Sequence, residues 1–261
     1  MRVVGFFSTT GNEKSQCITD NKIKKFKKKL KKIKYAVFDF DGTIYSGFLI
    51  VDLARQVFIK HAKNGESKYI KKLLIFGELL KNADKMSFHE ASLEFIKLLE
   101  GESYVEFCTG SQVFISKINS EAKIFVNFLK KIGVQCFLVS LTADFLAEKI
   151  VDEVGFDNYY SMKYKLFEDP SGNIFFSGNY EFNVLQPANF KLNSLNYFNI
   201  ENLEKKTLLV IGNSEDDCKL FDRAGLKIVV NPNKKLLEKY KFDLVIKSEE
   251  GSWNVISKMI K

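Results

Sequence analysis

Residues 35–43 read YAVFDFDGT, an apolar run that ends in two aspartates, a glycine and a threonine. We predict a short buried strand followed by a tight turn. The alternation of a strand places Asp39 and Asp41 on one side and Phe40 on the other. Burial penalises a charged carboxylate, and this cost is usually offset by a cation or a hydrogen-bond network. An Asp-Gly hairpin is the alternative, but it predicts an antiparallel strand directly afterwards, whereas a helical pattern follows.

Further buried strands are predicted after this first one, and helices alternate with them. They cover residues 134–140, 207–211, 226–230 and 242–246. Buried strands that alternate with helices indicate a parallel sheet covered on both faces. A β-rich stretch at 159–180 has the turn signals of a hairpin.

About ninety residues with helical periodicity separate the first two strands, too many for a simple crossover. Residues 70, 73, 74 and 80 lie at helical spacing along one apolar face of this segment. We therefore predict an α/β fold: a Rossmann-like parallel sheet core with an all-helical cap inserted between the first and second core strands. The expected divisions are a basic N-terminal extension at 1–34, a catalytic core at 35–45 and 133–261, and a helical cap at 46–132.

Positive charge is concentrated at the N-terminus. Residues 1–34 hold eleven basic and two acidic residues, a formal charge of +9, so the rest of the chain carries −1 of the net +8. Within residues 22–34, Ile23, Phe26, Leu30 and Ile33 lie at helical spacing among lysines. The favoured interpretation is a solvated, frayed extension. The alternative is a short cationic helix that contacts anionic lipid or nucleic acid phosphate.

Composition excludes several classes of protein. A hydrophobic content of 46% rules out a disordered or collagen-like chain. No apolar run reaches about 18 residues, and the opening segment lacks a signal-peptide core, so we expect a cytoplasmic protein. Two histidines and four cysteines without a C-x-x-C pair disfavour a zinc site and a Ser-His-Asp triad. Any catalysis is therefore expected from carboxylates.

Polar residues follow three of the predicted strands. They are residues 39–43, Ser140, and residues 212–217, which read GNSEDD. Taken singly, Ser140 fits a helix N-cap, the acids of 216–217 fit the first turn of a helix, and Lys191 fits a solvated lysine. Because ligands of parallel sheets bind at the carboxyl ends of the strands, their combined occurrence there favours a site.

These segments resemble the four motifs of the haloacid dehalogenase superfamily. The matching residues are 38–43, 138–140, Lys191 and 212–217, and residues 229–236 are similar to a further segment common in that superfamily. The helical insertion resembles the cap of the phosphoserine phosphatase-like branch. The resemblance covers about residues 35–250 and leaves the basic arm unexplained.

The resemblance implies a Mg²⁺-dependent phosphatase that hydrolyses a small phosphomonoester. Asp39 would attack phosphorus and form an aspartyl-phosphate, and Asp41 would protonate the leaving alcohol and then activate water. Phosphate oxygens would be held by Gly42, Ser140 and Lys191. The implied Mg²⁺ ligands are Asp39, Asp41, Asn213 and Asp217.

Two residues depart from the family pattern. Asn213 stands where the last motif usually has aspartate, so metal affinity is expected to fall. Phe48 stands where phosphoserine phosphatases carry a glutamate that pairs with the serine amine, so phosphoserine is disfavoured and an apolar substrate is allowed. Two alternatives stay open: a catalytically weak or inactive phospho-ligand-binding module, and a lipid-phosphate phosphatase docked at a membrane by the basic arm. No obligate protein partner is evident.

Overall fold

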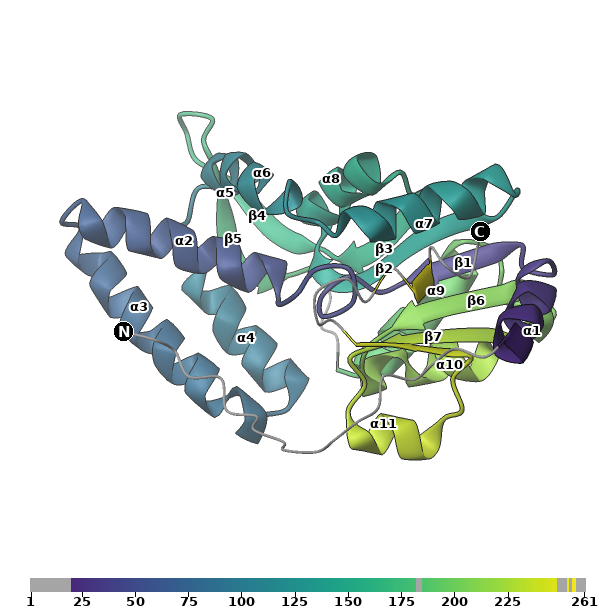
Figure 1. Ribbon diagram of the computed structural model, residues 1–261. Helices are drawn as coiled ribbons and strands as arrows, with labels where there is room; N and C mark the ends of the chain where they lie inside the picture. Colours follow the sequence, from purple (N-terminus) through teal and green to yellow (C-terminus); the bar gives the residue numbers. More distant parts are fainter. Residues whose placement is uncertain (1–19, 182–184, 248–252, 254, 257–261) are drawn as a thin grey trace.

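The computed structural model describes residues 20–181, 185–247, 253, 255 and 256. Its centre is a six-stranded, all-parallel sheet in the order β3-β2-β1-β6-β7-β8 (Figure 1). Phe38 of β1 pairs with Leu138 of β2 on one side and with Ile211 of β6 on the other, so these three strands end at the same edge. The strands are β1 Tyr35–Phe38, β2 Gln135–Ala143, β3 Asn158–Met162, β6 Leu208–Gly212, β7 Leu226–Val230 and β8 Leu244–Ile246.

Helices cover both faces of the sheet, which confirms the predicted fold class. One face carries a hydrophobic core that includes Phe38, Phe125 and Leu146, and the other a core that includes Val37, Val210 and Phe221. The helices of the first face are α7 Ser120–Lys131 and α8 Asp144–Val154. Those of the second are α9 Pro187–Tyr197, α10 Cys218–Arg223 and α11 Lys234–Lys239.

The cap helices follow β1, and most of them lie beyond one end of the parallel sheet (Figure 1). They are α2 Leu49–Lys63, α3 Ser67–Asn82, α4 Phe88–Leu98, α5 Tyr104–Gly110 and α6 Gln112–Ile115. The expected cap extended to residue 132, but α7 packs on the sheet, where Phe125 makes an edge contact with Phe38. The helical insertion therefore contains one helix that belongs with the core.

The predicted hairpin forms from β4 Tyr164–Glu168 and β5 Ile174–Tyr180. The sequence placed it within the core segment, yet it packs against the cap. The Phe176 amide donates to the Glu102 carbonyl, and the Gly101 amide donates to the Phe176 carbonyl. The Tyr180 hydroxyl donates to the carbonyl of Ser92 in α4 at 3.0 Å. The cap thus includes a two-stranded β-hairpin, which comes from the segment between β3 and α9.

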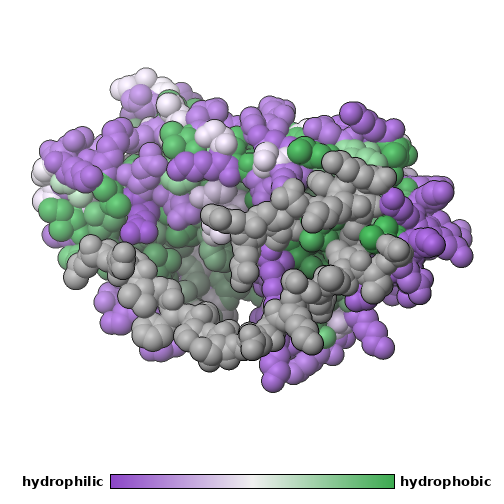
Figure 2. All heavy atoms as spheres, viewed as in Figure 1, coloured by the Kyte–Doolittle hydropathy of each residue, from purple (hydrophilic) through white to green (hydrophobic). Residues whose placement is uncertain are grey.

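The apolar face predicted from residues 70–80 is turned largely to solvent. Ile70, Leu74 and Leu80 are exposed, whereas Tyr69 and Phe76 are the residues of α3 that are buried. Figure 2 shows hydrophobic residues at the surface on the cap side of the molecule.

The prediction of a frayed basic extension was wrong over residues 20–34. Residues Asp20–Leu30 form α1, and Phe26, Leu30 and Ile33 are buried in the core of the first sheet face. Lys29 Nζ donates to Asp243 Oδ1 at 2.6 Å and to the Gly225 carbonyl at 3.1 Å. Burial of three large apolar side chains outweighs the lysine-rich composition, because each contributes about 1.5–3 kcal/mol. The predictions for residues 1–19 lie outside the described residues.

No helix in the described ranges is both long and apolar enough to cross a bilayer.

Candidate active site

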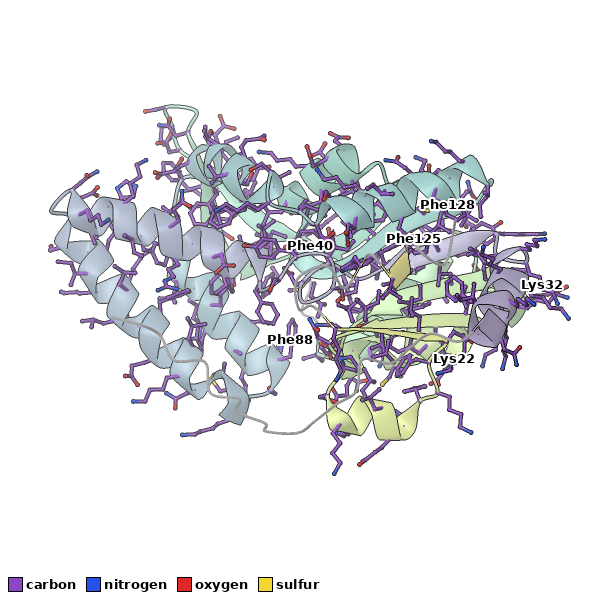
Figure 3. The ribbon with its side chains drawn as sticks, in the orientation of Figure 1. Lys22, Lys32, Phe40, Phe88, Phe125 and Phe128 are labelled. Atoms are coloured by element: carbon purple, nitrogen blue, oxygen red, sulfur yellow. The ribbon has the colours of Figure 1, made fainter. Side chains whose placement is uncertain are left out.

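Asp39 and Asp41 lie in the turn that follows β1. The carbonyl of Phe40 accepts hydrogen bonds from the amides of Thr43, Ile44 and Tyr45, and Gly42 has a φ of +75°. The Phe40 side chain is fully buried and anchors this turn at the junction of sheet and cap (Figure 3). A left-handed φ favours glycine, so the sequence Asp-Gly-Thr suits this turn.

Lys191 joins the ends of two strands. Its Nζ atom lies 2.7 Å from Asp39 Oδ1 and 2.7 Å from Asp217 Oδ1. The second oxygen of Asp39 accepts a hydrogen bond from Thr43 Oγ1 at 2.9 Å. All three charged residues are at most 4% exposed. The structure therefore brings together three of the predicted site residues, which are 26 to 178 positions apart in the chain.

Asp217 also shapes the loop after β6. Its Oδ2 atom accepts hydrogen bonds from the amides of Asn213 at 2.9 Å and Ser214 at 3.2 Å. A Cβ atom on Gly212 would lie 2.3 Å from that oxygen, so only glycine allows this close approach. Both oxygens of Asp217 are thus engaged in holding Lys191 and the loop.

Burial dominates the electrostatics of the paired charges. It raises the pKa of Asp39 to about 6, although the Lys191 charge acts in the opposite direction. For Lys191, burial favours the neutral amine, but the carboxylates of Asp217 and Asp39 outweigh it and raise the lysine pKa well above its ordinary value. At neutral pH the site therefore holds a charged lysine between carboxylates.

Asp41 is connected to the cap rather than to Lys191. Its Oδ1 atom accepts a hydrogen bond from the amide of Leu49, the first residue of α2, at 2.8 Å. Burial raises the pKa of Asp41 to about 7. A carboxyl group with such a pKa is suited to donate a proton near neutral pH and to take it back.

The two other predicted phosphate-binding residues make different contacts. Ser140 is buried in β2, and its Oγ atom accepts a hydrogen bond from the Thr142 amide at 3.1 Å. The Gly42 amide donates to the carbonyls of Tyr45 and Gly47. Contact of Ser140 and Gly42 with phosphate therefore stays a prediction.

The predicted Mg²⁺ ligands offer oxygen atoms of the kind that this ion prefers. The Asn213 side chain lies against Gly42, since a Cβ atom on Gly42 would lie 2.0 Å from its Nδ2 atom. Among the described residues no three acidic, histidine or cysteine side chains converge as a metal centre. Because Asp217 is engaged with Lys191 and the loop, the remaining predicted ligands are the Asp39 carboxylate, the Asp41 carbonyl and the Asn213 amide oxygen. They fit Mg²⁺ in chemical type but carry little charge, and their contact with the ion stays a prediction.

Two residues near the site were missed by the sequence reasoning. Thr43 was quoted within its motif without a role, and it orients Asp39. Tyr164, at the start of β4, is buried and interacts electrostatically with Asp41. No sequence signal placed Tyr164 there, because the hairpin reaches the site through its packing on the cap.

The family model of haloacid dehalogenase-like hydrolases matches residues 36–222. No curated protein matches the sequence. The fold is similar to that of a protein of unknown function from Bordetella pertussis Tohama I, with a TM-score of 0.66 and 16% identity over 82% of this chain and 98% of that one. It is also similar to a phospho-aspartyl intermediate analogue of phosphoserine phosphatase (TM-score 0.62, 24% identity, 88% and 100% of the two chains). A substrate-bound phosphoserine phosphatase gives a TM-score of 0.62 at 22% identity over 88% and 99%.

Proposed function

The chain belongs to the haloacid dehalogenase-like hydrolases, and we propose that it is a Mg²⁺-dependent phosphatase that acts through an aspartyl-phosphate on Asp39. The observation that carries the proposal is the position of Asp39. Its carboxylate follows a central strand, is held by Lys191 and Thr43, and lies in the same turn as Asp41. A carboxylate attacks a phosphate dianion poorly unless positive charge reduces the repulsion, and Lys191 supplies such charge.

In the first step an oxygen of Asp39 attacks phosphorus, and the bond from phosphorus to the ester oxygen breaks. Asp41 donates its proton to the departing oxygen, which leaves as the neutral alcohol. A pKa of about 7 keeps a large fraction of Asp41 protonated at neutral pH.

In the second step Asp41, now ionised, accepts a proton from water as the water oxygen attacks the aspartyl-phosphate. The bond between phosphorus and the Asp39 oxygen breaks, phosphate leaves, and Asp39 and protonated Asp41 are restored. Lys191 remains paired with Asp217 in both steps and stays beside the phosphoryl oxygens.

Mg²⁺, when bound, would neutralise charge on the phosphoryl oxygens. Asp39, the Asp41 carbonyl and Asn213 are its proposed ligands, and Asp217, which holds the loop, was predicted as a fourth. The proposed substrate is a small phosphomonoester other than phosphoserine.

Hydrolysis of an aryl phosphate with and without Mg²⁺ tests the proposal. The wild-type protein should hydrolyse the aryl phosphate, and Asp39→Asn should reduce the rate of hydrolysis to background. Asp243→Asn is the matched control, because Asp243 pairs with Lys29 of α1. Beryllofluoride in saturating Mg²⁺ should modify Asp39, and equal rates for wild type and Asp39→Asn would refute the mechanism.

Asn213 supports a second candidate, a module that binds phosphorylated ligands with little or no turnover. It would show saturable binding of inorganic phosphate without hydrolysis. A lipid-phosphate phosphatase docked through α1 is less well supported, because Phe26 and Leu30 of this helix are buried in the core and are not available to contact a lipid surface.

A further inference from the structure

Phe48 lies beside the proposed general acid. The Leu49 amide nitrogen is 2.8 Å from Asp41 Oδ1, and Phe48 precedes Leu49 in the chain. Standard bond lengths then place the Phe48 Cα within about 6 Å of that carboxyl oxygen. The side chain is 63% exposed. The backbone of Phe48 thus lies next to Asp41, and its side chain is accessible from solvent.

No structural role explains an exposed phenylalanine at this position. Phe48 is the N-cap of α2 and makes no side-chain cap hydrogen bond, and serine, threonine, aspartate or asparagine would stabilise the helix better there. Phe48 does not belong to either hydrophobic core. Within the part of the chain that the structure describes, this large apolar side chain therefore neither caps the helix nor joins a core, and it is accessible to a ligand.

The charged side chains around Asp41 are already paired. Asp39, Asp52 and Lys191 are those that act on its pKa. Lys191, the cation among these three, is held by Asp39 and Asp217, so it is not free to pair with an acidic leaving group. Asp52 Oδ2 accepts a hydrogen bond from the Tyr45 hydroxyl at 2.9 Å. The aromatic rings of Phe40 and Tyr45 stack in the same turn with their centroids 5.8 Å apart.

We propose that the substrate is the phosphomonoester of an uncharged, apolar alcohol, and that Phe48 is the side chain that contacts its hydrocarbon part. This inference rests on the proposed phosphatase function. As the bond from phosphorus to the ester oxygen breaks, that oxygen receives the proton of Asp41, so the carbon attached to it lies close to Asp41. A chain that continues from this carbon reaches the ring of Phe48, which removes apolar surface of both groups from water.

Alkyl phosphates of matched reactivity test this substrate class. Hexyl phosphate and ethyl phosphate have leaving groups of similar basicity, so the ratio of their kcat/KM values reports contact with the longer chain. We expect a ratio of about ten for the wild type. In Phe48→Ala the ratio should fall towards one, and in Phe48→Leu it should lie between the two. The exposed position of Phe48 makes misfolding of these variants a minor concern, and circular dichroism checks it.

Phe167→Ala is the control, since Phe167 is an exposed aromatic residue of β4. It should leave the hexyl-to-ethyl ratio unchanged. An unchanged ratio in Phe48→Ala would overturn the inference. So would a preference for 2-aminoethyl phosphate that Asp52→Asn removes, because Asp52 would then recognise a cation. Absence of turnover for every phosphate, aryl phosphates included, would instead refute the phosphatase function itself.

Discussion

Lys191 Nζ and Asp39 Oδ1 lie 2.7 Å apart in the interior, although the two residues are separated by 152 positions in the chain. The same amine contacts Asp217 at 2.7 Å, so one lysine of α9 connects the ends of β1 and β6. Such a pair neutralises charge that burial would otherwise penalise strongly. It also fixes the carboxylate that we propose as nucleophile.

Lys191→Met should destabilise the protein and abolish hydrolysis. Removing the amine leaves two buried carboxylates without a counter-ion, which costs about 3 to 5 kcal/mol in comparable cases. Urea denaturation at pH 7 measures this loss in the free energy of unfolding. The loss should be smaller at pH 5, where protonation relieves the repulsion between Asp39 and Asp217. Lys219→Met, at an exposed lysine of α10, is the control, and an equal effect of both substitutions would contradict the prediction.

Mg²⁺ should stabilise the protein more at pH 8 than at pH 5. Burial raises the pKa values of Asp39 and Asp41 from 3.8 to about 6 and about 7 in the metal-free fold. A raised carboxyl pKa lowers stability as pH rises from about 4 to about 7, because the folded state then holds protons that the unfolded state has released. Mg²⁺ is proposed to bind the ionised Asp39 carboxylate, so it should restore stability mainly above about pH 6, where Asp39 is ionised.

Thermal unfolding in EDTA and in excess Mg²⁺ across this pH range measures the effect. The metal-free protein should lose stability towards pH 8, and the Asp39→Asn variant should lose less. An increase in Tm with Mg²⁺ that is the same at pH 5 and pH 8 would show that the ion does not bind at these carboxylates.

The sheet could be predicted because its strands have a strong local signal. Residues 35–38, 136–139 and 208–212 are continuous apolar runs, and such runs are typical of strands buried on both faces. Charge composition misled the prediction for α1, because burial of Phe26 and Leu30 depends on the partner surface that the fold provides. The docking of the hairpin on the cap was unpredictable for a different reason. Part of it is made by backbone hydrogen bonds between residues 101–102 and Phe176, which require no particular side chains.

The site was predictable where strand ends impose proximity. Asp39 and Asp217 follow adjacent strands, so their convergence was expected, and Lys191 was assigned only through the family resemblance. The contacts of Ser140 and Gly42 could not be predicted from motifs, since both depend on the backbone of residues further along the chain.

Thr142→Val should stabilise the protein by about 1 kcal/mol. Thr142 is fully buried, and within the described ranges its hydroxyl has no hydrogen-bond partner. Valine has a similar shape and removes the unpaired polar group. Urea denaturation measures the change, with Thr207→Val as the control, because the Thr207 hydroxyl donates to the Glu204 carbonyl at 2.7 Å. Destabilisation by Thr142→Val would show that the hydroxyl is paired with an ordered water molecule or a ligand.

Asn213→Asp should tighten Mg²⁺ binding by about tenfold. The Asn213 side chain packs against Gly42, next to Asp41, so a carboxylate in its place adds negative charge where the ion is proposed to bind. Titration calorimetry with Mg²⁺ alone measures the affinity independently of turnover. Asn64→Asp, at the exposed C-cap of α2, is the control for a change in overall charge.

Gly42→Ala provides a second, opposite test of the same contact. A Cβ atom at this position would overlap the Asn213 amide, which would have to move away from Gly42. Mg²⁺ affinity should therefore fall in Gly42→Ala and rise in Asn213→Asp. If Asn213→Asp leaves the affinity unchanged, residue 213 is not a ligand. Asn213→Asp could instead raise the affinity and also give a clear rate of hydrolysis where the wild type has almost none. In that case the asparagine makes the natural protein a weak catalyst, and the binding-module function is favoured.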